Sequence, residues 1–260
     1  MTARYSRFKI SSSRKTALLS TTYFGPVQWY QKLYRHEHVL MEVYESFAKQ
    51  TYRNRCLIAT AQGVQALTVP VMAPSNLPPL GEAFEAGNSG TVASTSSSQS
   101  EAAARPLVAC NHRDARKPSG GRLVGATRLS NHGHWQHQHW QAITSAYGDS
   151  PFLEYYEDDL RPFFFETDRW ERLIDYNEAI RMKICELIDI HPHVELTANY
   201  EKNGHFIDFR DAIRPKQAPL DPDFEVRPYY QVFRQRHGFL PNLCILDLLL
   251  NMGPESVFFL

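Results

Sequence analysis

The chain has 260 residues, and its 28 Lys and Arg residues balance its 28 Asp and Glu residues, so the formal net charge at pH 7 is zero. This length suffices to bury a sizeable core in one domain, and the balanced charge argues against a nucleic-acid binder, which usually carries a basic excess. The four cysteines lie far apart, and neither a signal peptide nor a run of about eighteen apolar residues occurs, so we expect a reduced, cytoplasmic protein without a membrane span.

The first part of the chain predicts a strand, a helix and a second strand, at residues 16–24, 25–36 and 38–47. Pro26 lies in the first turn of the predicted helix, a position that proline favours. Strand, helix and strand in this order indicate a parallel βαβ unit. Residues 1–14 are polar and are predicted to be a disordered tail.

Two shorter strands are predicted next, at residues 55–58 and 65–71, with a turn between them. Residues 73–121 are rich in Ser, Ala, Pro and Gly and poor in aliphatic residues. Such a segment buries too little apolar surface to offset its ordering entropy, so we predict a flexible insertion between neighbouring strands. Residues 122–130 are predicted to form the strand that follows. The domain prediction is a single domain over residues 15–260, interrupted by this insertion.

The second half of the chain is predicted to be mostly helical. Apolar residues recur at helical spacing in three segments, and a further strand and a buried C-terminal helix follow. Ser150 and Pro151 are expected to begin the second of the three helices. The predicted fold class is α/β, with a mixed β-sheet that opens with the βαβ unit and a mostly helical C-terminal half. The predicted ranges are 135–147, 152–160 and 167–191 for the three helices, 194–200 for the strand and 240–250 for the last helix.

Four histidines lie within eight positions, at His132, His134, His137 and His139. On a helix they do not converge on one point, and no carboxylate lies at the spacing of a third ligand, so we expect no metal there. His139 differs because it shares the apolar face of its helix with Trp135. It is either a hydrogen-bonded core histidine or a site residue whose proton chemistry suits neutral pH.

Two other polar features are candidates for a site. Asn177 lies on an apolar helix face, where an amide either ties two elements together or lines a pocket. Arg53, Asn54 and Arg55 precede a strand that looks buried, and two arginines around an amide can bind a carboxylate or a phosphate. A solvated charge on an edge strand is the alternative. The chain contains no GxGxxG, Walker or GxSxG motif.

In order along the chain, the segments YFGPVQWY, TYRNRCLI, WQHQHWQAITSAYGDSPFLEYY, LIDYNEAI and YYQVFRQRHGFLPNLCILDLLLNMGP resemble the WbqC-like family of bacterial proteins, in its Bacteroidetes-type branch. The resemblance covers nearly all of the chain outside the first dozen residues and the insertion. It implies a role in O-antigen or surface-polysaccharide synthesis. Many members carry a His-Gln-Pro-Asn run before the first tyrosine, whereas this chain has Leu-Ser-Thr-Thr.

The resemblance also implies site residues at the positions that match the family's motifs. The resemblance and the residue chemistry together predict His139, Asn177 and Tyr147 as catalytic residues, with His139 as the general base. The predicted substrate-binding residues are Tyr23, Asn54, Arg55, Trp135 and Tyr155.

The functional hypothesis is transfer of glycine or another small acyl or aminoacyl group to an amino sugar or nucleotide sugar. The expected partner is therefore a small-molecule sugar substrate, and the cofactor is unknown from the sequence. The alternative hypothesis is a non-catalytic binding or scaffold module within a glycan-synthesis assembly. For a reaction centre, His139, Asn177 and Arg55 are expected to face one hollow between the sheet and the helical half.

Overall fold

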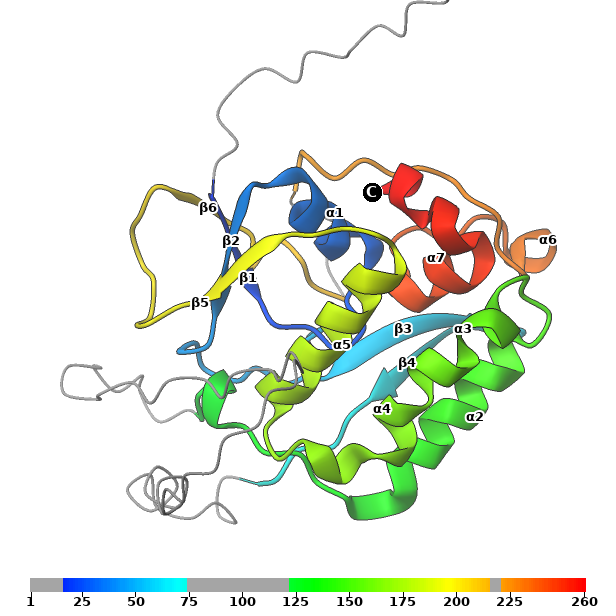
Figure 1. The fold of residues 1–260 in the computed structure, drawn as a ribbon, viewed down its shortest axis with the longest axis horizontal. Coiled ribbons are helices and arrows are strands. Elements are labelled where there is room, and N and C mark those ends of the chain that lie inside the picture. Colours follow the sequence, from blue (N-terminus) through cyan, green and yellow to red (C-terminus); the bar gives the residue numbers. More distant parts are fainter. Residues whose placement is uncertain (1–15, 74–121, 216–220) are drawn as a thin grey trace, which may run out of the picture.

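The computed structural model describes residues 16–73, 122–215 and 221–260 (Figure 1). The predicted N-terminal tail, and the predicted insertion apart from its first residue, lie outside the described residues. The parallel sheet occupies one side of the molecule, and the second and third helices lie on the other side with a β-hairpin (Figure 1). This arrangement confirms the predicted α/β class with a helical second half.

The predicted βαβ unit is present. Strand β1 (Thr16–Ser20) leads through helix α1 (Val27–Arg35) to strand β2 (His38–Glu42), and the two strands pair in parallel. Strand β5 (His193–Leu196) extends the sheet beside β2, and β6 (Phe206–Asp208) extends it beside β1. The strand order is therefore β5-β2-β1-β6, with every pair parallel. The second half thus completes the sheet that the first half begins.

A separate antiparallel hairpin joins β3 (Arg55–Thr60) and β4 (Gly63–Thr68). Gly63 turns the chain with a φ of 113°, a conformation that glycine adopts at little cost. The strand predicted over residues 122–130 was wrong, because the structure has a 3-10 helix η2 (Val124–Ala126) with only isolated bridges nearby. The backbone of Val124 there donates to the carbonyl oxygen of Glu45, so single loop contacts hold the segment and no strand ladder forms.

In the helical half, the first predicted helix is present with the predicted bounds, whereas the second and third helices begin later than predicted. The second predicted helix begins at Leu153, because the hydroxyl of Ser150 donates to the carbonyl oxygen of Tyr147 and so closes the preceding helix. The third begins at Leu173, because Trp170 is extended and stacks its ring on Phe163. The helices with their preceding turns are η3 (His132–His134), α2 (Trp135–Tyr147), α3 (Leu153–Leu160), α4 (Pro162–Phe165), η4 (Thr167–Arg169) and α5 (Leu173–Leu187).

The C-terminal part contains α6 (Arg234–His237), α7 (Ile245–Met252) and η5 (Gly253–Phe259). Helix α7 starts later than predicted, because the backbone nitrogen of Cys244 donates to the carbonyl oxygen of Leu57 in β3 and that of Ile245 donates to the carbonyl oxygen of Gly25. Residues from the sheet, the hairpin, α2, α5 and α7 join one hydrophobic core. In the described residues no helix is long and apolar enough to cross a membrane.

Candidate functional site at the end of strand β1

The carboxyl ends of β1 and β6 meet at a topological switch point of the sheet. The chain leaves β1 to reach β2 on one side, whereas β6, on the other side of β1, is reached from the far edge strand β5. In open α/β sheets, ligands bind in the crevice that forms outside the strand ends at such a point. From the topology alone we therefore expect a ligand site among the residues that follow β1 and β6.

A small crevice lies at this place, with a cavity of about 10 Å³, which is room for about one water molecule. Its lining combines the end of β1, the residues after β6 and the loop before β3. The lining residues are Leu19, Ser20, Thr21, Thr22, Trp29, Tyr52, Arg53, Phe209, Arg210 and Ile213.

The turn from β1 into α1 holds unusual features next to the crevice. Phe24 has a φ of 40°, a left-handed conformation that costs an aromatic residue about 1–3 kcal/mol and that is frequent at functional sites. The side-chain oxygen of Thr22 is buried and has no hydrogen-bond partner among the described residues. A Cβ atom at Gly25 would collide with that oxygen, so only glycine allows this close approach.

Arg53 provides one guanidinium at the crevice. Its Nε donates to Glu45 Oε1 at 2.8 Å, and its Nη2 donates to the second Glu45 oxygen and, at 2.8 Å, to Ser20 Oγ. The Arg53 residue is 8% exposed, and burial strengthens a charge-assisted pair of this kind. Nη1 of Arg53 makes no hydrogen bond to any residue that the structure describes.

Arg210 provides a second guanidinium and ties the strand ends together. It donates to Glu42 at the end of β2, to Asp208 in β6 and to the carbonyl oxygen of Glu201. Burial raises the pKa of Asp208, but the hydrogen bonds from Arg210 outweigh burial and lower that pKa below its usual value. Glu42 is fully buried, and burial raises its pKa despite the hydrogen bonds it accepts.

The charges of the crevice do not favour a free anion. Two guanidinium groups, of Arg53 and Arg210, face three carboxylates, of Glu42, Glu45 and Asp208. When all of these groups are ionised, the carboxylates exceed the guanidinium groups by one negative charge. A ligand group that is cationic, or that both donates and accepts hydrogen bonds, suits such a mixture better than a bare phosphate.

His139, Tyr23 and Trp135 lie together beneath the turn. Nδ1 of His139 is 3.0 Å from the hydroxyl oxygen of Tyr23, and the ring of Trp135 lies edge-on against His139. His139 is 6% exposed and Tyr23 is fully buried. Burial lowers the pKa of His139 from 6.5 to about 4, partly opposed by a hydrogen bond to the backbone of Thr68, so this imidazole is neutral at pH 7.

Asn177 connects the helical half to the crevice. Its Nδ2 donates to Thr21 Oγ1 at 3.1 Å and to the carbonyl oxygen of Arg53 at 2.8 Å, and its Oδ1 is buried without a partner among the described residues. Asn54, the next residue in the loop, donates to the carbonyl oxygen of Val69. Both amides therefore fix the loops that form the crevice.

The other predicted residues lie elsewhere. The hydroxyl of Tyr147 is fully buried and donates to Asp247 in α7. Arg55 donates to Thr68 at the surface of the hairpin, and Tyr155 is 72% exposed on α3. His139, Asn177 and Arg55 do not line the crevice, so the structure does not bring these three together in the way the sequence hypothesis requires.

Sequence reasoning missed the carboxylates Glu42 and Glu45 and the guanidinium of Arg210. A usable signal was present, because polar residues that directly follow buried strands meet at one edge of a parallel sheet. The pairing of β6 with β1 was not predictable, so the sequence could not indicate that Arg210 lies at the crevice.

A larger hollow lies away from the sheet. It is an open groove of about 650 Å³ between the start of α3, the end of α7 and the segment before α6. Asn251 in this groove is 3% exposed, and its Oδ1 is buried without a partner among the described residues. The groove is lined by Pro151, Phe152, Tyr230, Asn251, Met252, Pro254 and Glu255.

Comparison with known proteins gives one match. No curated protein and no solved structure matches this chain. Residues 115–214, which include α2 to α5, β5 and β6, match the model of the WbqC-like protein family. The narrower assignment to a Bacteroidetes-type branch stays a prediction. The family resemblance is therefore confirmed, and this chain carries a WbqC-like region that spans residues 115–214.

Proposed function

We propose that this chain acts in the biosynthesis of a bacterial surface polysaccharide and transfers glycine or another small acyl or aminoacyl group to an amino sugar or nucleotide sugar. The WbqC-like region supports a role related to polysaccharide biosynthesis. The observation that supports this reaction is the crevice at the end of β1, where two guanidinium groups form ion pairs with three carboxylates. Its slight negative excess favours the amino group of an acceptor sugar.

The crevice contains the types of group that acyl transfer to an amine needs. The attacking amine loses a proton to a base, and the oxyanion that forms at the carbonyl carbon needs a hydrogen-bond donor. Glu45 is a carboxylate that accepts hydrogen bonds from Arg53, which lines the cavity, and Arg53 has an Nη1 without a protein partner among the described residues. In this proposal Glu45 takes the proton from the attacking amine and Arg53 donates to the oxyanion. The oxyanion then collapses and expels the leaving group of the activated acyl donor, which takes up the proton from Glu45. The cavity of about 10 Å³ admits one amino group while the sugar ring stays at its mouth.

His139 and Asn177 then act as positioning residues. His139 holds Tyr23 at the turn after β1, and Asn177 holds Thr21 and the backbone of Arg53. A neutral imidazole that is sealed beneath the turn is poorly placed to take a proton from a sugar amine. His139 and Asn177 thereby hold in place the turn and the loop that form the crevice.

Mass spectrometry of amino sugars and amino-sugar nucleotides incubated with glycine and activated acyl donors tests this function. The informative variant is Thr22→Val, because the buried Thr22 hydroxyl has no protein partner and its loss should not weaken the fold. We expect a loss of rate of about tenfold or more with an unchanged unfolding curve, because in this proposal the unpartnered Thr22 hydroxyl, which belongs to the crevice lining, hydrogen-bonds the reacting group together with Arg53. Thr144→Val on α2 is the matched control, since the Thr144 hydroxyl donates to the carbonyl oxygens of Trp140 and Gln141 in its own helix. Full activity of the Thr22 variant would exclude the crevice as the reaction site, and no product with any donor would reject the transferase.

The large groove favours a second candidate, a non-catalytic glycan-binding module. Its volume of about 650 Å³ lies in the range of small-molecule sites, and it combines aromatic rings with the unpaired Asn251 oxygen. Tyr230 is 51% exposed at this groove, so Tyr230→Ala should weaken glycan binding in calorimetry without unfolding the chain. Unchanged glycan affinity in that variant would rule out the groove as the binding surface.

A further inference from the structure

Two histidines and a glutamate meet on the surface of the parallel sheet, far from the histidine-rich start of α2. His38 is the first residue of β2 and His193 is the first residue of β5. The two are direct neighbours in the parallel register of these strands. Glu195 follows His193 by two positions, and residues two apart in a strand point to the same face. The strand pairing therefore brings three potential metal ligands together.

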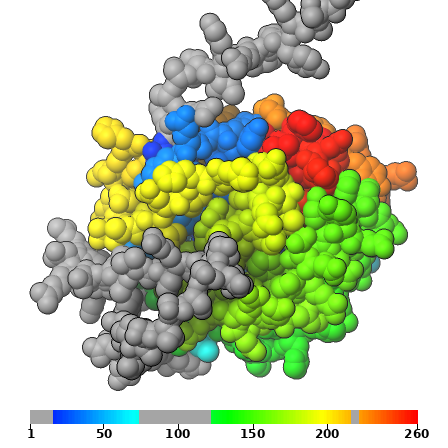
Figure 2. Space-filling model, viewed as in Figure 1, coloured from blue at the N-terminus to red at the C-terminus, as the bar shows by residue number. Residues whose placement is uncertain are grey.

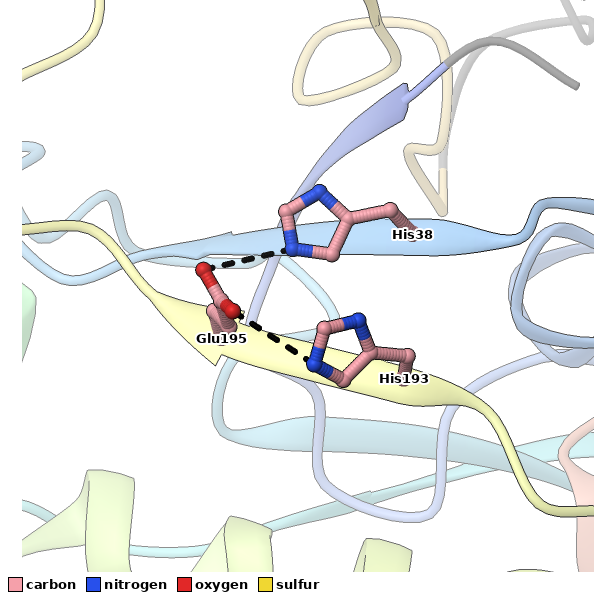
Figure 3. Close-up of side chains that lie close together, drawn as sticks. All are labelled: His38, His193 and Glu195. Carbon is pink, nitrogen blue, oxygen red and sulfur yellow. Dashed lines mark ion pairs between the residues drawn. The ribbon is translucent and has the colours of Figure 1, made fainter.

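The geometry of the three side chains is close to that of a metal site. One ligand atom from each residue lies within 4.8 Å of the others. His38 Nε2 is 3.3 Å from one Glu195 oxygen, and His193 Nε2 is 3.4 Å from the other (Figure 3). Ligand atoms around tetrahedral zinc lie about 3.3 Å apart when the bonds are about 2.0–2.1 Å long. The imidazole rings face each other with centroids 4.8 Å apart.

One ring nitrogen of His38 lacks a hydrogen-bond partner among the described residues. Its Nε2 is buried, and although it lies at ion-pair distance from Glu195 it makes no hydrogen bond to any described residue. A buried ring nitrogen without a hydrogen bond is costly unless another partner satisfies it. A metal ion between His38, His193 and Glu195 would be such a partner.

The cluster is open to solvent on its outer side. The side chains of His193 and Glu195 are 67% and 55% exposed, whereas that of His38 is 30% exposed. The segment that carries β5, drawn in yellow, lies at the surface in Figure 2. Two imidazoles and a carboxylate leave at least one coordination position for water, and imidazole with carboxylate suits zinc and its neighbours among the divalent transition metals.

We propose that His38, His193 and Glu195 bind a divalent transition-metal ion, with Zn²⁺ as the probe. The site lies at the starts of β2 and β5, whereas the crevice lies at the carboxyl ends of the strands, so the ion takes no part in the proposed transfer. It clamps the edge strand β5, which leads out of the helical half, onto β2, which belongs to the first half. Metal binding thereby stabilises the folded chain by mass action.

Zinc titration of chelator-treated, tag-free full-length protein against a chromophoric zinc chelator at pH 7.5 tests the proposal. The parent protein for this experiment replaces the exposed His132, His134 and His137 with Gln, which removes a competing surface cluster. We expect one Zn²⁺ per chain, and a loss of affinity of tenfold or more in His38→Gln, in His193→Gln and in Glu195→Gln. The melting temperature should rise with Zn²⁺ in the parent and not in these variants.

His191→Gln is the matched control, because His191 is exposed, pairs with Asp189 and lies two residues before His193. Its zinc affinity should equal that of the parent. Circular dichroism of each variant verifies that the fold persists, as the exposure of these side chains leads us to expect. No zinc binding by the folded parent, or equal affinity in His38→Gln, His193→Gln and the parent, would overturn the site. Neither outcome bears on the transferase assay, which uses the crevice.

Discussion

Replacing His139 tests whether this histidine is a buried, neutral imidazole that supports the turn after β1. In the folded protein its pKa is about 4, against an ordinary 6.5, because burial disfavours the charged form. The unfolded chain therefore binds the proton more tightly than the folded one. The contribution of His139 to stability is complete above pH 6.5 and is lost as the pH falls toward 4.

The magnitude follows from the two pKa values. The pKa values of His139 in the folded and unfolded chain differ by about 2.5, and one pKa unit corresponds to about 1.36 kcal/mol. Protonation of His139 therefore lowers the free energy of unfolding by at most about 3 kcal/mol below pH 4, and by about 2 kcal/mol at pH 5. Acid also removes the contributions of Asp208 and Asp221 to the stability of the fold, because their pKa values in the folded protein are lowered. The effect of His139 must therefore be measured as a difference between variants.

Urea unfolding of the wild type and of His139→Gln at pH 7.5 and pH 5 measures this difference. At pH 7.5 the variant should be less stable by about 1–3 kcal/mol, because the Tyr23 hydroxyl loses its well-placed partner. At pH 5 the stability of the variant relative to the wild type should be higher by about 2 kcal/mol than at pH 7.5, since the glutamine does not titrate. His137→Gln, an exposed position on the same helix, should follow the wild type at both pH values.

An equal gap at both pH values would refute the reasoning, since it would mean that His139 titrates alike in the folded and unfolded chain. A fully stable His139→Gln variant without activity would instead restore the general-base hypothesis.

Two further substitutions test the packing around the candidate site. Gly25→Ala should lower the free energy of unfolding by about 1–3 kcal/mol, because the new methyl group collides with Thr22; an unchanged urea midpoint would contradict the close approach. Tyr147→Phe should cost about 1–3 kcal/mol in thermal unfolding, because Asp247 loses a buried donor and the amide of Ala59 loses an acceptor. The matched Tyr155→Phe change, at a side chain that is 72% exposed, should have almost no effect, and equal losses in both variants would show that the buried network contributes nothing.

Local sequence patterns predicted the opening βαβ unit, the hairpin and helix α2, because each depends on residues close together in the chain. Alternating or continuous apolar residues specify a strand, and an apolar stripe that ends at glycine specifies a helix such as α2. The predicted strand after the insertion failed, because pairing depends on a partner that the local sequence does not show. The start of α5 was missed because the packing of Trp170 on Phe163 overrode the helical pattern.

The sequence by itself determined that His139 and Asn177 are structurally demanding positions, since a polar group on an apolar helix face must find a partner. Only the tertiary structure decided what those partners are: the Tyr23 hydroxyl for His139, and Thr21 and the carbonyl oxygen of Arg53 for Asn177. The tertiary structure alone also placed Arg210 beside the end of β1 and His38 beside His193, because these contacts join residues more than 150 positions apart through the order of the parallel strands. Strand order arises from the packing of the whole chain, and no local pattern encodes it.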